Sequence, residues 1–554
     1  MTLTIGLRGL AFGCRHALAG LAMVSLAACS GGGGGGDDSS TFTPPTSGGT
    51  PTSVTISGTI TFDSVPHNSN AIGLNYSGIT QEPVRGVTVQ ATTGAGAVLD
   101  SDVTDGSGRY AVDVDPNTNV RIQVRSEMVQ DAAADWDIRV LDNTRSNALY
   151  ILAGSLTNSG TSNSIRNLNA ASGWTGAAYT QTRAAGPFAI LDGIYDALAD
   201  LTAVDATITF PDLQIFWSVN NRSADGDVAD GDIGTSSYTR ISGVPTILIL
   251  GDVNNDTDEY DTHVVVHEFG HYFEDQVARG DSIGGAHSLT DRLDPRVAFS
   301  EGWANAFSGM VLDPVYRDAQ GAGQLFGFAF SVESNSYPNE GWFNEGSIQS
   351  ILYDVFDSAS DGVDTISAGL GPIYSAWTDS DFLNEDSFST VFSYLDVLQD
   401  EPAVSATVLN ALRAAQNING TGPLGIGETN DGGDMPNLPV YKPITVGGAA
   451  VEVCSNDDNG TYNKLGNRAF LVVTVTGGSR TFSMTQTSGA ANRNPEFRIW
   501  NNGLFFVLPS DPIGQPEIVI FSPSADTYII EAFDAENTED GGTRGDACYD
   551  FTVN

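Results

Sequence analysis

A short histidine and glutamate motif is the part of this sequence best suited to chemistry. Residues 267–271 read His267-Glu268-Phe269-Gly270-His271. On an α-helix, side chains four positions apart share one face and lie about 6 Å apart along the axis, so both imidazoles can bind one metal ion. Glu268 would lie beside an open coordination position, where it can take a proton from an activated water. The spacing therefore predicts His267 and His271 as metal ligands and Glu268 as general base.

The helix that presents this motif has recognisable ends. Thr257 or Asp256 is its expected N-cap, and Gly280, directly after Arg279, is its expected stop. His263 lies one turn before His267, and we expect it to support the site or the packing rather than to bind metal.

A catalytic zinc site needs a third protein ligand and an open position. No His-x-x-Gly-x-x-His continuation follows His271, which disfavours a site with three histidines. Asp294 followed by Pro295 begins a second expected helix, near 295–312, with Glu301 in its middle. Small residues around Glu301, among them Gly302 and Ala304, would let this helix approach the first closely. A buried carboxylate there needs a cation. Glu301 is thus the expected third ligand, with Glu345 as a rival that lacks clear helix signals around it.

At this point the sequence resembles a family. His-Glu-Phe-Gly-His at 267–271 and Ser-Glu-Gly-Trp-Ala-Asn at 300–305 are similar to the gluzincin zinc metallopeptidases, the broad thermolysin-like group, and most closely to its fungalysin-type pattern. The resemblance implies Zn²⁺ bound by His267, His271 and Glu301, peptide or protein substrates, and Glu268 as general base. Asn305 stands where the family has an aspartate that orients a ligand histidine, and an amide is a weaker partner than a carboxylate.

One feature of that family is missing, because no histidine follows His287 in this chain. The group that stabilises the oxyanion must then be His287 itself, a tyrosine such as Tyr353, or an arginine such as Arg292. The strand expected at 244–250 is a candidate edge for pairing with an extended peptide.

The pattern of the remaining chain predicts a multidomain protein. The expected parts are a β-sandwich at 54–127, a β-rich connecting region at 128–170, an α+β zincin domain at 171–435 and a second β-sandwich at 440–554. Gly86-Val87-Thr88-Val89 followed by Thr104-Asp105-Gly106-Ser107-Gly108-Arg109-Tyr110 resembles the transthyretin-like fold of carboxypeptidase regulatory domains. That resemblance bears on the fold of the first part and says little about function.

The N-terminus predicts export. Residues 1–28 carry Arg8 and Arg15 before an apolar run, as in a secretory signal, and Leu26-Ala27-Ala28-Cys29 resembles a bacterial lipobox. Lipid on Cys29, with Ser30 after it and a flexible tether of Gly, Ser, Thr and Pro at 29–53, indicates a protein anchored to the cell envelope, in the outer membrane, or an extracellular one. An ordinary signal peptide is the alternative.

Two cysteines remain once Cys14 has left with the signal and Cys29 has taken lipid. In an exported protein, Cys454 and Cys548 are expected to form a disulfide, with two buried thiols as the alternative.

Composition sets limits on partners. The 554 residues include 68 acidic and 24 basic side chains, a formal charge of −44, which excludes nucleic acid and binding to a membrane through a basic face. The acidic runs 225–232 and 252–258 could bind Ca²⁺, although neither has EF-hand spacing.

Two functions stay open: a surface-anchored zinc metallopeptidase, and a non-catalytic surface binding or adhesion protein with a degenerate zincin domain. The intact Glu268 favours the enzyme, because catalysis alone requires it.

Overall fold

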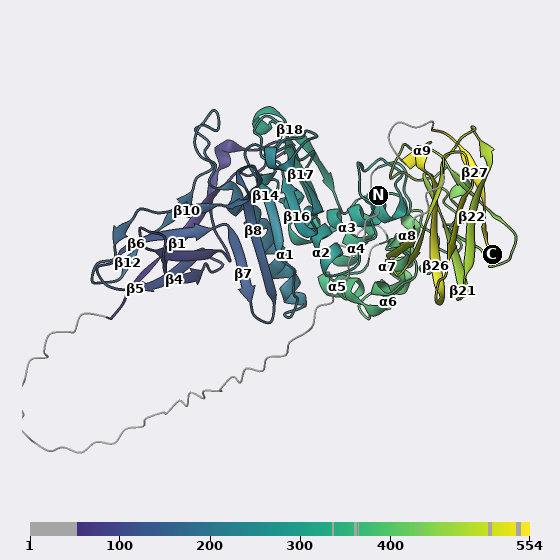
Figure 1. Ribbon diagram of the computed structural model, residues 1–554. Coiled ribbons are helices and arrows are strands. Elements are labelled where there is room, and N and C mark those ends of the chain that lie inside the picture. The colour runs from purple at the N-terminus through teal and green to yellow at the C-terminus, as the bar shows by residue number, and fades with distance from the viewer. Residues whose placement is uncertain are drawn as a thin grey trace, which may run out of the picture. The chain divides into compact units, whose positions relative to one another are not determined.

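The computed structural model describes residues 52–554 except 335–336, 359–362, 364, 434, 508–511 and 539–543. All of these residues belong to one compact unit, Pro51–Asn554. The predicted signal peptide, the lipid attachment site at Cys29 and nearly all of the tether lie outside the described residues. The architecture is multidomain, with several β-sheets, a group of helices and a β-rich C-terminal part (Figure 1).

The N-terminal part consists of two small sheets with alternating buried and exposed side chains. One sheet contains β1 (Val54–Ser64), β2 (Thr80–Pro83), β5 (Arg109–Val114), β12 (Ser164–Ile165) and β13 (Leu168–Ala170). The other contains β3 (Thr88–Thr92), β4 (Val98–Val103), β6 (Asn119–Arg125), β10 (Ile151–Ala153) and β11 (Thr157–Asn158). The period-two pattern of the sequence thus produces the expected strands, with the apolar positions of β1, β3, β5 and β6 forming the core.

A six-stranded sheet supports the helices that carry the metal motif. Its strands are β7 (Glu127–Asp131), β8 (Asp135–Asp142), β9 (Ala148–Leu149), β14 (Leu213–Trp217), β15 (Ser237–Ile241) and β16 (Val244–Ile249). Residues 128–170, which we expected to form one connecting region, are divided: β7 to β9 join this sheet, while β10 to β13 return to the N-terminal sheets. The expected edge strand at 244–250 is wrong, because β16 is paired on both sides, with β14 and β15. The edge is β15.

Two helices follow the sheet and pack side by side. The first, α2 (Thr262–Gln276), carries the His-Glu-x-x-His motif, and the second, α3 (Pro295–Val311), carries Glu301 (Figure 1). The prediction for α3 is confirmed, including its cap, because the Asp294 side chain accepts a hydrogen bond from the Arg296 N–H. The other helices are α1 (Gly186–Val204), α4 (Glu345–Phe356), α5 (Leu370–Thr378), α6 (Ser380–Leu383), α7 (Val391–Leu398) and α8 (Ala406–Ala415), and a hairpin of β17 (Val315–Gln320) and β18 (Phe326–Ser331) precedes α4.

Small residues allow α2 and α3 to approach closely, but not every small residue of α3 lies at this contact. A Cβ on Gly270 would lie 3.2 Å from the Ala304 Cα, so this pair marks the contact between the two helices. A Cβ on Gly302 would lie 2.7 Å from Ile348 on α4, so Gly302 faces α4 instead of α2. Trp303 Nε1 donates to the Gly270 carbonyl (3.0 Å) and fixes the crossing of α2 and α3.

The ends of α2 differ from the expected ones. Its N-cap position is Asp261 instead of Thr257 or Asp256, and residues 258–260 form a separate 3-10 turn. The helix ends at Gln276, before Arg279 and Gly280. The carboxylates of Asp256, Asp258 and Asp261 turn toward one another instead of capping the helix, and this gathering explains the later start.

The C-terminal part is built of two sheets around a second hydrophobic core. One sheet contains β19 (Tyr441–Pro443), β21 (Arg468–Thr476), β23 (Pro495–Asn501), β24 (Leu504–Val507) and β26 (Ala525–Asp534). The other contains β20 (Val451–Ser455), β22 (Arg480–Gly489), β25 (Glu517–Phe521) and β27 (Ala547–Val553), and the short α9 (Ala535–Thr538) follows β26. The predicted disulfide is confirmed: Cys454 on β20 and Cys548 on β27 are bonded partners on neighbouring strands.

A buried ion-pair network joins α3 to the C-terminal part. Glu531 on β26 accepts from Arg296 Nη2 (2.9 Å) and lies 2.9 Å from Arg468 Nε. Glu531 and Arg296 are 0% and 1% exposed. A buried charge without a partner is strongly unfavourable, so this network holds the start of the Glu301 helix against β26.

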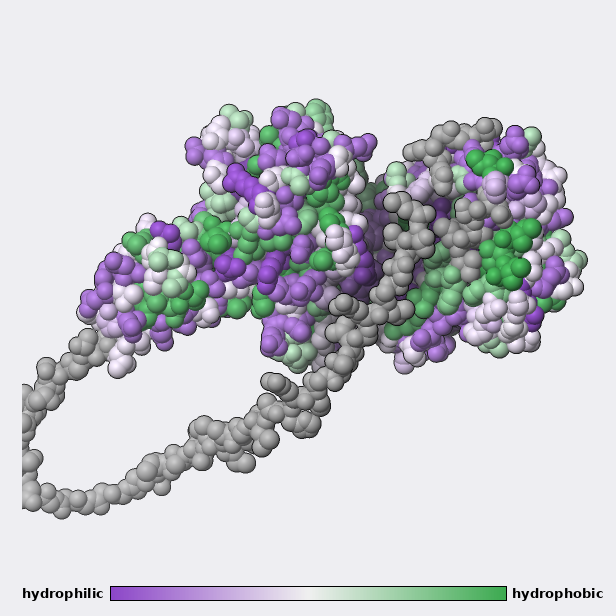
Figure 2. All heavy atoms as spheres, viewed as in Figure 1, coloured by the Kyte–Doolittle hydropathy of each residue, from purple (hydrophilic) through white to green (hydrophobic). Residues whose placement is uncertain are grey.

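The surface is mostly hydrophilic, with hydrophobic residues gathered in places on the C-terminal part (Figure 2). Exposed large hydrophobic side chains of that part include Leu504, Phe505, Phe506, Ile518 and Ile520. Over the described stretches of chain, we find no helix with both the length and the apolar character that crossing a bilayer requires.

Candidate metal centre

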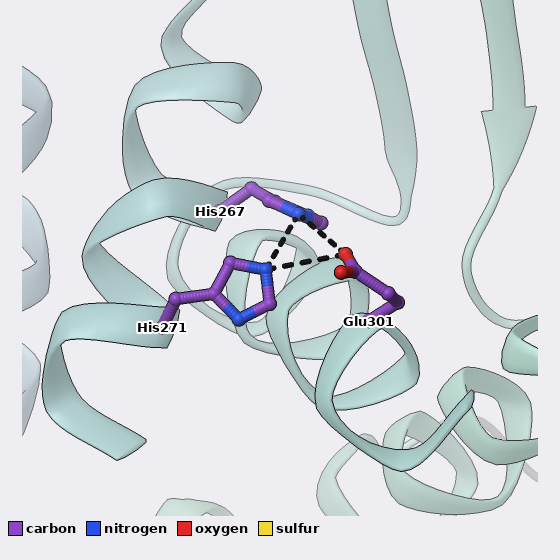
Figure 3. Close-up of side chains that lie close together, drawn as sticks. All are labelled: His267, His271 and Glu301. Carbon is purple, nitrogen blue, oxygen red and sulfur yellow. Dashed lines mark hydrogen bonds and ion pairs between the residues drawn. The ribbon is translucent and has the colours of Figure 1, made fainter. Parts of the chain in front are cut away.

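Three potential metal ligands converge where α2 meets α3. His267 and His271 extend from successive turns of α2, and Glu301 points at them from α3 (Figure 3). The two Nε2 atoms are 3.1 Å apart, and Glu301 Oε2 lies 3.3 Å from His267 Nε2 and 3.2 Å from His271 Nε2. The structure therefore brings together the three residues that the sequence predicted as ligands.

The spacing of these three atoms suits zinc. Bonds of about 2.0–2.1 Å in a tetrahedron place ligand atoms roughly 3.3–3.4 Å apart. The separations of 3.1, 3.2 and 3.3 Å are close to that value. Two imidazole nitrogens and one carboxylate oxygen are a donor set that zinc favours, and three protein ligands leave one position open. The residues present thus fit a catalytic zinc ion.

Glu268 lies beside this cluster and is fixed by the sheet. Its side chain is buried, and Oε2 accepts a hydrogen bond from the Tyr238 backbone N–H on β15 (2.6 Å). Because β15 is the edge strand, Tyr238 can direct this N–H away from the sheet toward α2. One oxygen of Glu268 is therefore engaged, and the other is left for proton transfer.

His271 is oriented by two side chains that sequence reasoning missed. Ser300 Oγ donates to Glu274 Oε2 (2.6 Å) and lies 3.1 Å from His271 Nδ1. Since the single hydroxyl proton goes to Glu274, Ser300 accepts from a protonated Nδ1, which leaves the Nε2 lone pair free for metal. The sequence did offer a signal for this contact, because Glu274 follows His271 by three positions on the same helix.

The charges of the cluster support one another. Burial alone would raise the pKa of Glu301, but His287 and His271 hold it well below its usual range. Burial lowers the pKa of His271, yet Glu301 and Glu274 outweigh it and raise that pKa well above its usual value. The surroundings of Glu301 therefore favour its ionised form with a positive charge beside it.

Asn305 does not take the predicted role toward a ligand histidine. It is buried and lines the same cavity as His267, but within the described residues no hydrogen bond joins its side chain to His267 or His271. The Nδ1 of His271 is already engaged by Ser300, and in the same part of the chain the Nδ1 of His267 has no partner.

His263 is a packing residue of α2. Its Nε2 lies 3.1 Å from the Asp313 carbonyl oxygen, and its ring packs near Tyr316. Burial lowers the pKa of His263 to about 4, so the imidazole is neutral at pH 7. It is separate from the three-ligand cluster, as expected for a supporting residue.

His287 reaches the cluster from the loop between the two helices. Its Nε2 lies 3.2 Å from Glu301 Oε2, and its Nδ1 lies 2.8 Å from Glu345 Oε2. Glu345, the rival third ligand, begins α4 and pairs with His287. Ligand atoms of Glu345, His287 and Glu301 lie within 4.8 Å of one another, so these three residues form a second possible ligand group beside the first. Tyr353 and Arg292 do not line the cavity that contains His267 and Glu268. Of the three candidates for oxyanion stabilisation, only His287 lines this cavity, and both of its ring nitrogens face carboxylates.

The cluster opens to two hollows. The larger, about 920 Å³, is lined by His267, Glu268, His287 and the aromatic side chains of Tyr316 and Phe328. A smaller one of about 210 Å³ is lined on the other side by His271 and Glu301. Tyr316, which the sequence did not single out, packs its ring 6.1 Å from that of His267. The larger cavity has room for several residues of an extended peptide.

The candidate site lies in a region that is similar to a known domain family. Residues 241–415 match the Mycolysin C-terminal domain family. The matched range contains His267, Glu268, His271 and Glu301, and it covers less than half of the chain. This family is associated with metallopeptidases and occurs in secreted proteins. Over this region, which contains the candidate metal centre, the chain is thus similar to a domain of secreted metallopeptidases.

Other comparisons are distant. No curated protein matches the chain. Among solved structures, the pre-peptidase C-terminal domain of a Bacillus anthracis collagenase aligns with 21% of this chain and 94% of its own, at 10% identity and a TM-score of 0.16. The surface-associated copper-binding protein CorA of Methylomicrobium album BG8 aligns with 21% and 98%, at 8% identity and 0.15. The Aeromonas hydrophila lysozyme inhibitor PliG aligns with 21% and 99%, at 12% identity and 0.13. Such low scores establish no shared fold.

Proposed function

We propose that the protein is a zinc metallopeptidase of the gluzincin type, which hydrolyses peptide bonds in exported peptide or protein substrates. The observation that carries the proposal is the convergence of His267, His271 and Glu301 to within 3.3 Å, beside a buried Glu268. Its place within a metallopeptidase-associated domain supports the same conclusion.

In the proposed reaction, zinc bound by His267, His271 and Glu301 would act as a Lewis acid on water and on the peptide carbonyl. Glu268 would accept the proton that the attacking water loses and later deliver it to the leaving amine. The Tyr238 N–H holds Glu268 Oε2, so we assign proton transfer to Oε1. His287 lines the larger cavity. Because Glu345 holds its Nδ1, His287 would donate a hydrogen bond to the developing oxyanion from Nε2, which would have to leave Glu301 Oε2.

Metal content and cleavage together test this function. We expect one zinc per chain, casein or peptide cleavage that a chelator abolishes, and recovery of cleavage when zinc is restored. Glu301→Gln should weaken zinc binding by more than the roughly 10–100-fold that loss of a supporting hydrogen bond costs. Glu345→Gln is the matched variant, because it makes the same chemical change at the neighbouring carboxylate, which pairs with His287.

The outcomes separate the alternatives. Zinc lost from Glu345→Gln but kept by Glu301→Gln would reassign the third ligand. A protein that binds no metal and stays folded would contradict the whole ligand set. A zinc-loaded protein that cleaves neither casein nor a peptide library would favour the non-catalytic surface binding protein.

We also propose that the protein is held at the bacterial cell envelope by lipid on Cys29. The proposal rests on the sequence Leu26-Ala27-Ala28-Cys29 and is supported by the Cys454–Cys548 disulfide, which forms in oxidising compartments. We expect the mature N-terminal peptide to begin at Cys29 and to carry the mass of attached acyl chains. A free Cys29 thiol or cleavage elsewhere, measured by mass spectrometry, would contradict the anchor.

A further inference from the structure

A second group of possible metal ligands lies at the start of α2. Two acidic runs were noted in the sequence, 225–232 and 252–258. In the first, Asp232 pairs with Arg222 (2.6 Å), and Asp227 accepts a hydrogen bond from the Ala229 N–H (2.8 Å). The second run contributes Asp256 and Asp258 to a compact group of carboxylates. The two runs are therefore not equivalent.

The compact group has four members from two separate parts of the chain. Asp256, Asp258 and Asp261 lie in the segment that leads into α2, and Asp318 lies on β17. One oxygen from each carboxylate lies within 4.8 Å of the others. Asp256, Asp258 and Asp261 are 5%, 3% and 0% exposed. Four carboxylates at this distance repel one another strongly in a buried site.

Three of the four carboxylates are satisfied by protein on one oxygen only. Asp258 Oδ2 accepts from Ser236 Oγ, Asp261 Oδ1 from the Ala319 N–H (3.1 Å), and Asp318 Oδ2 from Gln320 Nε2 (3.2 Å). The other oxygen of each, Asp258 Oδ1, Asp261 Oδ2 and Asp318 Oδ1, is buried without any hydrogen-bond donor. A buried carboxylate oxygen with no donor is costly, and three together indicate a missing cation.

The described protein supplies no such cation. Within that part of the chain, no lysine or arginine forms an ion pair with any of the four. Asp261 Oδ1 lies 2.9 Å from His67 Nε2, but a single imidazole cannot balance four carboxylates. The site is thus unfavourable as four free carboxylates.

We propose that Asp256, Asp258, Asp261 and Asp318 bind a calcium ion that ties the start of the His-Glu-x-x-His helix to β17. Calcium takes six to eight oxygen ligands in adaptable geometry, whereas magnesium prefers one or two carboxylates and keeps its waters. Asp256, Asp258 and Asp318 also line the cavity of about 920 Å³, so an ion and its waters can enter. The proposal does not depend on peptidase activity.

Calcium titration of the whole chain tests the site. We expect calorimetry to find a calcium ion that binds at this site, and thermal unfolding to shift upward with CaCl₂ but much less with MgCl₂. Asp318→Asn and, on the other segment, Asp256→Asn should each weaken calcium binding at least about tenfold, because each removes one charged ligand. Asp225→Asn, an exposed aspartate of the other acidic run, is the matched control and should bind calcium as wild type does.

A second readout uses the calcium-free protein. Without calcium, Asp318→Asn should unfold at the same or a higher temperature than wild type, because it removes one repelling charge. Wild type that takes up no calcium at millimolar concentration would overturn the proposal, as would unchanged affinity in both Asp318→Asn and Asp256→Asn. Loss of binding in Asp225→Asn alone would place the ion in the other acidic run. None of these readouts involves zinc or cleavage, so they fail separately from the proposed function.

Discussion

Glu268→Gln is expected to lower kcat/KM for peptide cleavage by roughly 10²–10⁴-fold, the usual contribution of a general base, while zinc remains bound. Glutamine has the same shape, and its amide oxygen can still accept from the Tyr238 N–H, which now meets Glu268 Oε2 at 2.6 Å. The substitution therefore removes proton transfer without moving the helix. Steady-state cleavage of a fluorogenic peptide, measured beside zinc content, checks both halves of the prediction.

Glu340→Gln is the matched control, since it makes the same chemical change at an exposed glutamate within residues 241–415. It should leave kcat/KM unchanged. If Glu268→Gln retained wild-type cleavage with zinc in place, Glu268 would not be the base and the mechanism would be wrong. If the variant lost zinc as well as activity, the two roles would not be separable, and Glu268 would have to be counted among the groups that build the centre.

Glu531→Gln is expected to lower the free energy of unfolding by about 3–5 kcal/mol, because it leaves the buried Arg468 without its carboxylate partner, whereas Arg296 keeps Asp294. Glu531 is fully buried between Arg296 and Arg468, and its Oε2 also accepts from Trp500 Nε1 (3.1 Å). Chemical denaturation at pH 7 measures the loss. Glu452→Gln, at an exposed position on β20, should change the stability little.

The same network makes stability depend on acidity in a defined direction. Burial alone would raise the pKa of Glu531, but Arg296 and Arg468 lower it from 4.5 to about 2. A pKa that is lower in the folded state stabilises the protein above pH 4.5, and this stabilisation, about 3 kcal/mol, is lost as the pH falls toward 2. Wild type should therefore lose stability across this window more steeply than Glu531→Gln. Parallel curves for the two proteins would contradict the assignment.

Much of the local structure follows from the sequence because its signals are local. Asp294 and Pro295 mark the start of α3, and Phe188, Leu191 and Leu198 share the buried face of α1. Cys454 and Cys548 were paired by elimination within an exported chain, and the bond joins them. Caps and helical periodicity involve residues within a few turns of one another. The disulfide spans 94 residues, and its prediction followed from the small number of cysteines instead of from a local pattern.

Non-local features were the ones that sequence reasoning placed wrongly. The strand at 244–250 was expected at an edge but lies between β14 and β15, because strand order is set by pairing across the sheet. Gly302 was expected to face α2 and faces Ile348 on α4. Asn305 was matched by position to a residue that orients a histidine, whereas Ser300 and Glu274 contact His271.

The sequence by itself determined the chemistry of the candidate centre: two imidazoles on one helical face, a carboxylate between them in the motif, and a second helix with a buried glutamate. Helical geometry fixes such spacings within a few residues. Only the tertiary structure decided what surrounds them, namely that His287 reaches Glu301, that Tyr238 holds Glu268, and that Asp318 meets the aspartates before α2. These contacts join residues far apart in the chain, and the packing of sheet against helices, which no local pattern encodes, brings them together.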